Sequence, residues 1–157
     1  ARLARGDDRD LENFAQEVRR FYPFFPFVAG RAREDFVWAH HRFSVGDWVL
    51  LDLYGTNRDS RAWDSADRFL PDRFRDREPG AFDLIPQGGG DPRRGHRCPG
   101  DRVAVGLVKQ ALSFLAGGMR YTVPPQDLDH DLSEFPALPQ SGFRIEKVAP
   151  AEESSAD

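Results

Sequence analysis

The sequence predicts a mainly α-helical fold with small β-sheets (α+β), and three observations support this class. Two segments, Asp8–Phe21 and Asp101–Leu115, repeat apolar residues at every third or fourth position, as amphipathic helices do. The remaining apolar runs are short and end at Pro, Gly or Asp, which is typical of short strands and turns. With 157 residues, 39% of them hydrophobic and 31% charged, the chain can form one globular core.

The first helix is expected from Asp8 to Phe21, and Asp8 or Asp10 can cap its start. Pro23 and Pro26 end this helix, because proline cannot continue the backbone hydrogen-bond ladder. An aromatic stretch, residues 22–28, follows the helix. The apolar face of the helix carries Leu11, Phe14, Ala15 and Val18.

The middle of the chain predicts two short strands, Asp35–Trp38 and Trp48–Leu53, with a turn at Val45–Asp47 before the second. Short helical turns are expected between Asn57 and Phe74. From Gln87 to Gly100 the composition, rich in Gly, Pro and Arg, indicates a loop.

A second, longer helix is expected from Asp101 to Leu115, ended by Gly117 and Gly118. Two further strands are expected after it, Arg120–Val123 and Phe143–Val148. Residues 1–150 are therefore interpreted as one unit, and residues 151–157 as a disordered tail. Apolar residues of the second helix recur at every fourth position, at Val103, Leu107, Ala111 and Leu115.

The composition excludes several classes of partner. A formal net charge of −4 provides no bulk field that would attract nucleic acid or an anionic membrane. No apolar run approaches the roughly 20 residues that span a bilayer, so no membrane span is expected. A single cysteine excludes an internal disulfide and is typical of a reducing, cytoplasmic compartment.

That cysteine, Cys98, lies directly before the second predicted helix. Free backbone N–H groups and the helix dipole favour negative charge there, and Arg97 and His96 add positive neighbours. Such surroundings favour the thiolate, which is the form that binds metal. Gly95 and Gly100 allow tight turns on either side and leave room for a flat ligand.

Two other roles for Cys98 stay open at this point. A lone cysteine is commonly a buried, inert thiol, although its neighbours here are Arg, His, Pro and Gly. It could also be the nucleophile of a hydrolase, with a histidine as its base. The candidate bases for that reaction are His40, His41 and His130.

The segment His96-Arg97-Cys98-Pro99-Gly100, followed by a long helix, resembles the cysteine loop of the cytochrome P-450 superfamily. The resemblance implies the C-terminal part of that fold, with haem b (iron protoporphyrin IX) as cofactor. It implies that Cys98 is the catalytic residue and the axial ligand to iron, and that His96 contacts a haem propionate. A thiolate ligand pushes electron density onto iron and favours O–O cleavage.

The loop before Cys98 points to one branch of that superfamily. The usual family loop has Phe seven residues and Gly four residues before the cysteine, where this chain has Asp91 and Arg94. It has instead a longer, glycine-rich segment, Pro86–Asp91. This segment resembles the loop of fatty-acid peroxygenases, which use hydrogen peroxide.

Three further residues extend the resemblance. Glu17 and Arg20 are three positions apart and share a helix face, which alone is a weak signal of a surface ion pair. In the family, such a pair locks with an arginine in a segment like the one that contains Arg73. The resemblance therefore implies a buried structural ion network of Glu17, Arg20 and Arg73.

The aromatic stretch after the first helix is a candidate substrate site. In a general protein, Phe24, Phe25 and Phe27 would be core residues. In the family this stretch leads into a strand beside the haem, which implies that the three rings line an apolar pocket for an alkyl chain. The segment Pro139–Phe143 matches another family segment that reaches toward substrate.

The resemblance thus implies a haem-thiolate oxidoreductase that hydroxylates or decarboxylates fatty acids with hydrogen peroxide and without a redox partner protein. A conventional monooxygenase, supplied with electrons by a partner, is the first alternative. A non-catalytic remnant is the second, because family members are more than twice as long and their distal helix has no counterpart here. On that ground the chain alone is expected to be poorly stable.

Overall fold

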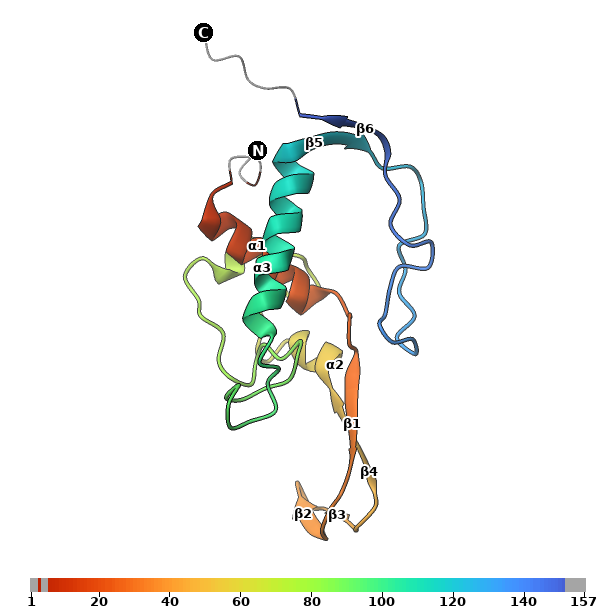
Figure 1. The fold of residues 1–157 in the computed structure, drawn as a ribbon. Helices are drawn as coiled ribbons and strands as arrows, with labels where there is room; N and C mark the ends of the chain where they lie inside the picture. Colours follow the sequence, from red (N-terminus) through yellow and green to blue (C-terminus); the bar gives the residue numbers. More distant parts are fainter. Residues whose placement is uncertain (1–2, 4–5, 152–157) are drawn as a thin grey trace.

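Three α-helices and three two-stranded antiparallel sheets form the described part of the chain, residue 3 and residues 6–151 of a computed structural model. This arrangement confirms the predicted class of helices with small sheets (Figure 1). The elements in chain order are α1 (Asp8–Phe21), β1 (Phe27–Arg31), β2 (Phe36–Trp38), β3 (His41–Phe43), β4 (Trp48–Asp52), α2 (Leu53–Asn57), a 3-10 turn (Pro71–Phe74), α3 (Asp101–Ser113), a π-helical turn (Phe114–Gly118), β5 (Met119–Thr122) and β6 (Glu146–Pro150).

The start of α1 is capped by Asp7, one residue before the helix, and not by Asp8 or Asp10 as predicted. The Asp7 carboxylate accepts hydrogen bonds from the backbone N–H groups of Arg9 and Asp10. Only a residue just outside the helix can reach these free donors, so Asp8 and Asp10 instead supply negative charge to the first turn.

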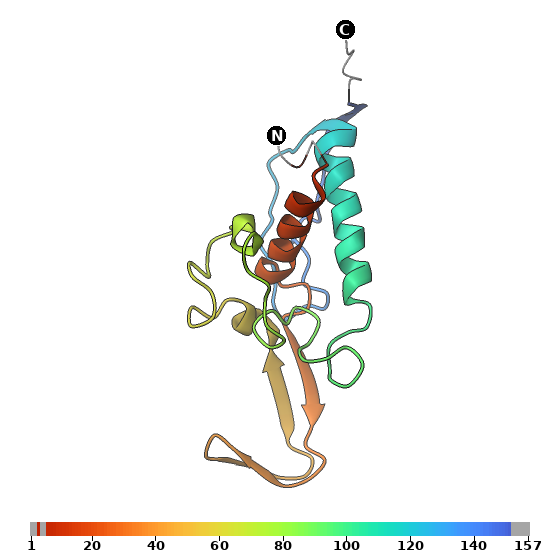
Figure 2. The same cartoon turned by 90° about the vertical axis from the view of Figure 1, so that its left-hand side faces the viewer.

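Helix α1 packs against α3, and the two form the centre of the molecule (Figures 1 and 2). Lys109 of α3 joins them at one edge, with its Nζ 2.7 Å from Asp8 Oδ1 and 3.2 Å from Glu12 Oε2. On its other side, α1 contacts the 3-10 turn. A small core of Trp63, Ala66, Phe74 and Leu84 lies in this region, and the indole N–H of Trp63 donates to the Asp83 carbonyl at 3.0 Å.

The β1–β4 ribbon extends away from the helices and carries the β2–β3 hairpin at its far end (Figure 2). Its register pairs Phe27 with Asp52 and Arg31 with Trp48. The β3 strand was not predicted. Its turn places Ala39 and His40 at φ values of 46° and 68°, a conformation that sequences normally signal with Asn or Gly.

The C-terminal segment departs from prediction at one strand. β6 begins at Glu146, whereas the sequence predicted a strand from Phe143 to Val148. The Gln126 side chain explains the difference, because it accepts from the Arg144 N–H at 2.8 Å and donates to the Arg144 carbonyl at 3.0 Å. These two bonds occupy the backbone groups that a strand would use for pairing.

The α-helical part of α3 ends at Ser113, two residues before the predicted end, and the chain continues through the π-helical turn. Ala151 donates its N–H to the Gly118 carbonyl. The rest of the predicted tail, residues 152–157, lies outside the described residues. In the part that the structure describes, no helix is both long and apolar enough to cross a membrane.

Candidate functional site: the cysteine loop and the adjoining cavity

Cys98 is an exposed, free cysteine just before α3. Its backbone is fixed on both sides: its N–H donates to the Gln87 carbonyl at 2.9 Å, and its carbonyl accepts from the Asp101 N–H at 3.1 Å. A Cβ on Gly100, the residue at the N-cap of α3, would lie 3.6 Å from the Cys98 sulfur. The thiol therefore lies beside a helix start that no side chain caps, where negative charge is stabilised. Its exposure removes the buried, inert thiol as an alternative.

The glycine-rich segment folds back onto the cysteine loop. Gly88 has a φ of +89°, and a Cβ there would lie 2.0 Å from the His96 carbonyl oxygen. Gly95 is similarly close, with an added Cβ 3.0 Å from backbone atoms of Asp91. The two segments can touch only because these positions lack side chains, so the extra glycines shape the base of the cysteine loop.

A buried charge network joins α1 to both segments of the loop. The Arg19 guanidinium bonds to the Asp101 carboxylate and, at 3.0 Å, to the Gln87 side-chain oxygen. Asp101 also accepts from Arg97 at 2.6 Å. The pKa of Arg19 is lowered to about 10, chiefly by burial and then by the neighbouring charge of Arg97, while Glu12 and Cys98 oppose the change. Arg19 is therefore a buried cation at neutral pH.

The structure also brings Glu17, Arg20 and Arg73 together. The side chains of Glu17 and Arg20 are fully buried, and Arg20 Nη2 lies 2.8 Å from Glu17 Oε1. Arg73 Nε lies 3.1 Å from Glu17 Oε2. Arg20 also donates to three backbone carbonyls, those of Asn57, Ala66 and Arg68. The network joins α1 to the segment around the 3-10 turn.

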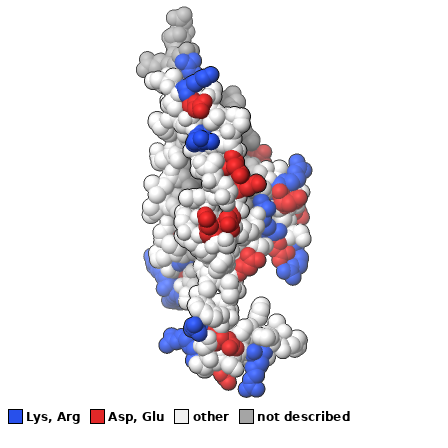
Figure 3. Space-filling view, turned by 90° about the vertical axis from the view of Figure 1, so that its right-hand side faces the viewer, with Lys and Arg blue, Asp and Glu red and all other residues white. Residues whose placement is uncertain are grey.

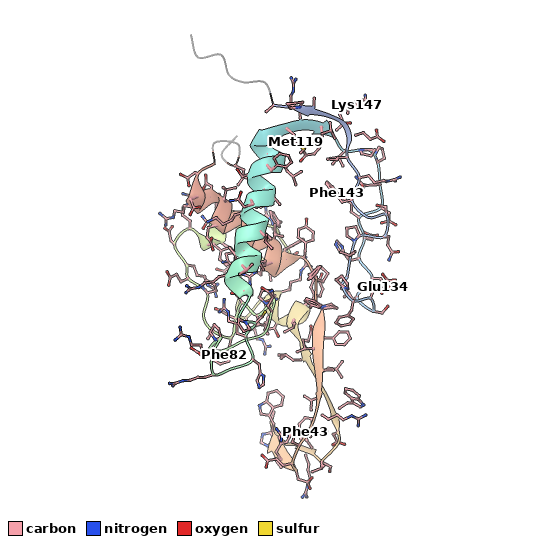
Figure 4. The ribbon with its side chains drawn as sticks, in the orientation of Figure 1. Phe43, Phe82, Met119, Glu134, Phe143 and Lys147 are labelled. Carbon is pink, nitrogen blue, oxygen red and sulfur yellow. The ribbon has the colours of Figure 1, made fainter. Side chains whose placement is uncertain are left out.

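An apolar cavity of about 620 Å³ lies between α1, α3 and the C-terminal segment. Phe24 and Phe25 line it, whereas Phe27 lies outside the lining and packs against Phe135 with ring centroids 4.7 Å apart. Phe143 reaches the cavity from the C-terminal segment, on the side that faces α3 (Figure 4). The α3 residues in the lining are Ala104, Leu107 and Val108.

The histidines do not surround the thiol. His96 is exposed, and its backbone carbonyl faces Gly88. His41 packs its ring on Phe43 at the far hairpin, and His130 faces Tyr22 across 5.8 Å between ring centroids. Within the described residues no histidine side chain hydrogen-bonds Cys98, so the geometry gives the hydrolase alternative no base.

The site fits a haem group held by one thiolate. Cys98 is exposed directly before α3, and the cavity has the size of a cofactor or ligand site. The cavity meets the glycine-rich segment at Pro86 and Gln87 and does not include Cys98 itself. Among the described residues, no group of three or more His, Cys, Asp or Glu could hold a metal ion by itself.

Sequence reasoning missed the residues that hold the loop: Arg19, Gln87, Gly88 and Asp101. Arg19 lies beside Arg20 in a common helix pattern, and its partners are 68 and 82 positions away. No local signal predicts contacts at that separation. Asp101, directly after the cysteine loop, offered the one clue, because an acidic residue in a first helical turn attracts a cation.

Comparisons with known proteins place the whole arrangement in one family. Residues 11–141 match the family model described as cytochrome P-450. Vinorine hydroxylase of Rauvolfia serpentina is 31% identical over 149 residues, which cover 90% of this chain and 29% of that protein.

Two solved structures share the fold closely. Cytochrome P-450EX alpha with myristic acid is 46% identical with a TM-score of 0.80, covering 89% of this chain and 34% of that one. A variant of cytochrome P-450 OleT with arachidonic acid is 38% identical with a TM-score of 0.84, covering 97% of this chain and 36% of that one. The chain thus spans about a third of the structures that it matches, and it belongs to the cytochrome P-450 family.

Proposed function

We propose that the protein is a haem-thiolate oxidoreductase that uses hydrogen peroxide to hydroxylate fatty acids, or to decarboxylate them to terminal alkenes. The observation that carries the proposal is the apolar cavity of about 620 Å³ bordering the glycine-rich segment at Pro86 and Gln87. An apolar wall is suited to an alkyl chain, because each buried CH₂ group contributes about 0.8 kcal/mol. Two structures similar to this chain contain long-chain fatty acids.

Each candidate residue has a distinct task in this proposal. The Cys98 thiolate binds the iron of haem b, and His96 orients a haem propionate. Phe24, Phe25 and Phe27 shape the alkyl site, Phe27 through its contact with Phe135. Bound haem would supply the activation of peroxide, a step that a thiolate ligand promotes.

The glycine-rich segment supports peroxide over a redox partner as the source of oxidising power. Gly88 and Gly95 hold this segment against the cysteine loop. We infer that the extra residues of this segment would alter the docking of an electron-transfer protein at the cysteine loop. Hydroxylation converts a C–H bond and H₂O₂ into C–OH and water, and decarboxylation converts the acid and H₂O₂ into an alkene, CO₂ and two waters. Neither reaction needs a further reductant.

The test uses the full-length, haem-loaded protein with myristic acid and isotopically labelled hydrogen peroxide, without a reductase. The proposal predicts a hydroxy acid that carries the label, or an alkene with one carbon fewer. Phe24→Ala should raise KM more than it lowers kcat, because the ring would bind the chain without touching the reacting atoms. Val45→Ala, on the distant hairpin turn, is the matched control.

A conventional monooxygenase is the second candidate, because a curated relative of this chain is named a hydroxylase. Turnover that requires a reduced partner protein and dioxygen, with no product from peroxide, would favour it. A protein that binds no haem would contradict both candidates and would favour the interpretation of the chain as a non-catalytic remnant.

A further inference from the structure

The backbone of Cys98 is held by two residues, one on each side. Gln87 accepts from its N–H at 2.9 Å, and Asp101 donates to its carbonyl at 3.1 Å. Both residues also carry a polar side chain that bonds to Arg19. The direction of the Cys98 sulfur therefore depends on how firmly Gln87 and Asp101 are held.

One side chain holds both of them. The Nη2 atom of Arg19 donates to Gln87 Oε1 at 3.0 Å and pairs with Asp101 Oδ1. The Arg19 side chain is 8% exposed and that of Asp101 is 10% exposed, so water competes weakly for these bonds. Arg19 is part of α1, whose neighbouring residues Glu17 and Arg20 are fixed in the buried ion network. Its position is thus determined by the helix core and not by the loop.

The rest of the network strengthens this connection. Arg19 Nη1 donates to Gln16 Oε1 at 2.8 Å, which sets the plane of the guanidinium. Arg97, the residue directly before Cys98, binds the second Asp101 oxygen at 2.6 Å. Asp101 is therefore shared between an arginine on α1 and an arginine of the cysteine loop. A planar guanidinium suits this task because its donors have a fixed geometry.

We infer that Arg19 is a positioning residue for the Cys98 thiolate: through Gln87 and Asp101 it clamps the backbone on both sides of the cysteine to helix α1. Arg19 forms no hydrogen bond with the sulfur, so it acts through its two partners.

The inference is tested on the haem-loaded, full-length protein by following the carbon monoxide complex of the reduced form. The red-shifted Soret band of that complex reports thiolate ligation, and its decay reports loss of the thiolate. Arg19→Gln should shorten the lifetime of this band by about tenfold, a size typical of residues in one polar network. Arg19→Lys keeps the charge but loses the planar guanidinium with its fixed set of donors, and should give an intermediate lifetime of the band.

Arg102→Gln is the matched control, because it removes the same charge from an exposed position one residue after Asp101. Its lifetime should equal that of the unchanged protein. The double variant Arg19→Gln with Asp101→Asn should decay no faster than the more affected single variant, because both changes open the same clamp. Effects that multiply would contradict the clamp.

A purely structural role would give a different result. If Arg19→Gln lowers the midpoint of thermal unfolding, followed by helix signal, but leaves the lifetime of the thiolate band unchanged, the inference is wrong. Gln87→Leu is a second variant for the case that Arg19→Gln does not fold. It keeps the backbone hydrogen bond to Cys98 and removes only the side-chain bond to Arg19. It should still shorten the lifetime.

The inference rests on the part of the proposed function that assigns Cys98 as the iron ligand, and not on the substrate or oxidant. A protein that shows the thiolate band but oxidises no fatty acid would contradict the proposed substrate and leave the clamp testable. A protein that never shows the band would overturn the clamp.

Discussion

At the residue scale, the Glu17 carboxylate is the centre of the buried ion network. It has no exposed surface, and its oxygens accept from Arg20 and Arg73 and from the backbone N–H of Leu70 at 2.7 Å. A buried carboxylate is tolerable only with such a full set of donors. The network is therefore more costly to break at one member than a surface ion pair would be.

Arg20→Met tests this difference. Because it removes a buried cation, leaves part of Glu17 unpaired and frees three backbone carbonyls, it should lower the free energy of unfolding by about 3–5 kcal/mol. Urea unfolding of the full-length protein, followed by helix signal, measures it. An effect as small as that of the control described next would contradict a central role for the buried network.

Lys109→Gln is the control, because Lys109 also pairs with two carboxylates, but these partners, Asp8 and Glu12, are 88% and 41% exposed to water. It should cost less than about 1 kcal/mol. The hydrogen bond that Lys109 donates to Asp8, opposed by partial burial, raises the pKa of Lys109 above its ordinary 10.5. Its small contribution is thus complete below pH 10.5 and disappears as the pH rises through the raised pKa. Loss of the contribution between pH 5 and pH 8 would show that the ammonium is not its source.

At the element scale, the start of α3 depends on how closely the glycine-rich segment approaches the cysteine loop. Gly88→Ala places a methyl group against the His96 carbonyl at a residue whose φ is +89°. We expect weaker haem retention, with faster transfer of haem to an acceptor protein, because the two segments must separate.

Gly106→Ala in α3 is the matched substitution. A Cβ at Gly106 meets nothing within 4 Å, so alanine should stabilise the helix by about 0.5–1 kcal/mol and leave haem retention unchanged. Equal haem loss in both variants would contradict the role assigned to Gly88.

The same elements show where sequence reasoning succeeds. Apolar periodicity predicted α1 and α3 because the helical period is visible in neighbouring residues. Leu11 and Ala15 of α1 are buried, whereas Val103 and Leu107 of the predicted apolar stripe of α3 are exposed. It failed at β3, whose turn is formed by Ala39 and His40, and at β6, which is displaced by the Gln126 side chain. Both failures arise from backbone conformations or distant side chains that leave no local pattern.

The candidate site likewise contains residues that the sequence singled out and residues that it did not. Cys98 was predicted because a helix start, glycines and arginines surround it in the sequence itself. Arg19 was missed because its task depends on Gln87 and Asp101, which reach it only in the folded chain. Phe27 was grouped with Phe24 and Phe25 by adjacency, but it lies on β1 and packs on Phe135.

At the scale of the whole molecule, many large apolar side chains of the described residues are exposed and are not packed into the core. On α3, Val103 and Leu107 are 65% and 67% exposed, and Phe114 is 59% exposed. One side of the molecule shows long uncharged stretches between scattered charged groups (Figure 3). Exposed apolar surface of this extent marks a contact site or a tendency to aggregate.

The isolated 157-residue chain should therefore bind a hydrophobic dye strongly. Leu107→Glu, on the cavity wall, should reduce dye fluorescence severalfold, because it places a charge in the apolar surface. Val45→Glu makes a similar change on the distant hairpin turn and should have little effect. Equal reduction by both variants would show that the dye does not report this surface.

The most direct measurement of the central claim is the carbon monoxide difference spectrum of the reduced, haem-loaded protein, compared with that of Cys98→Ser. We expect a red-shifted Soret band in the unchanged protein and its loss in Cys98→Ser, since Cys98 is the single cysteine of the chain. A band that persists in Cys98→Ser, or that is absent from the unchanged protein, would contradict thiolate ligation by Cys98.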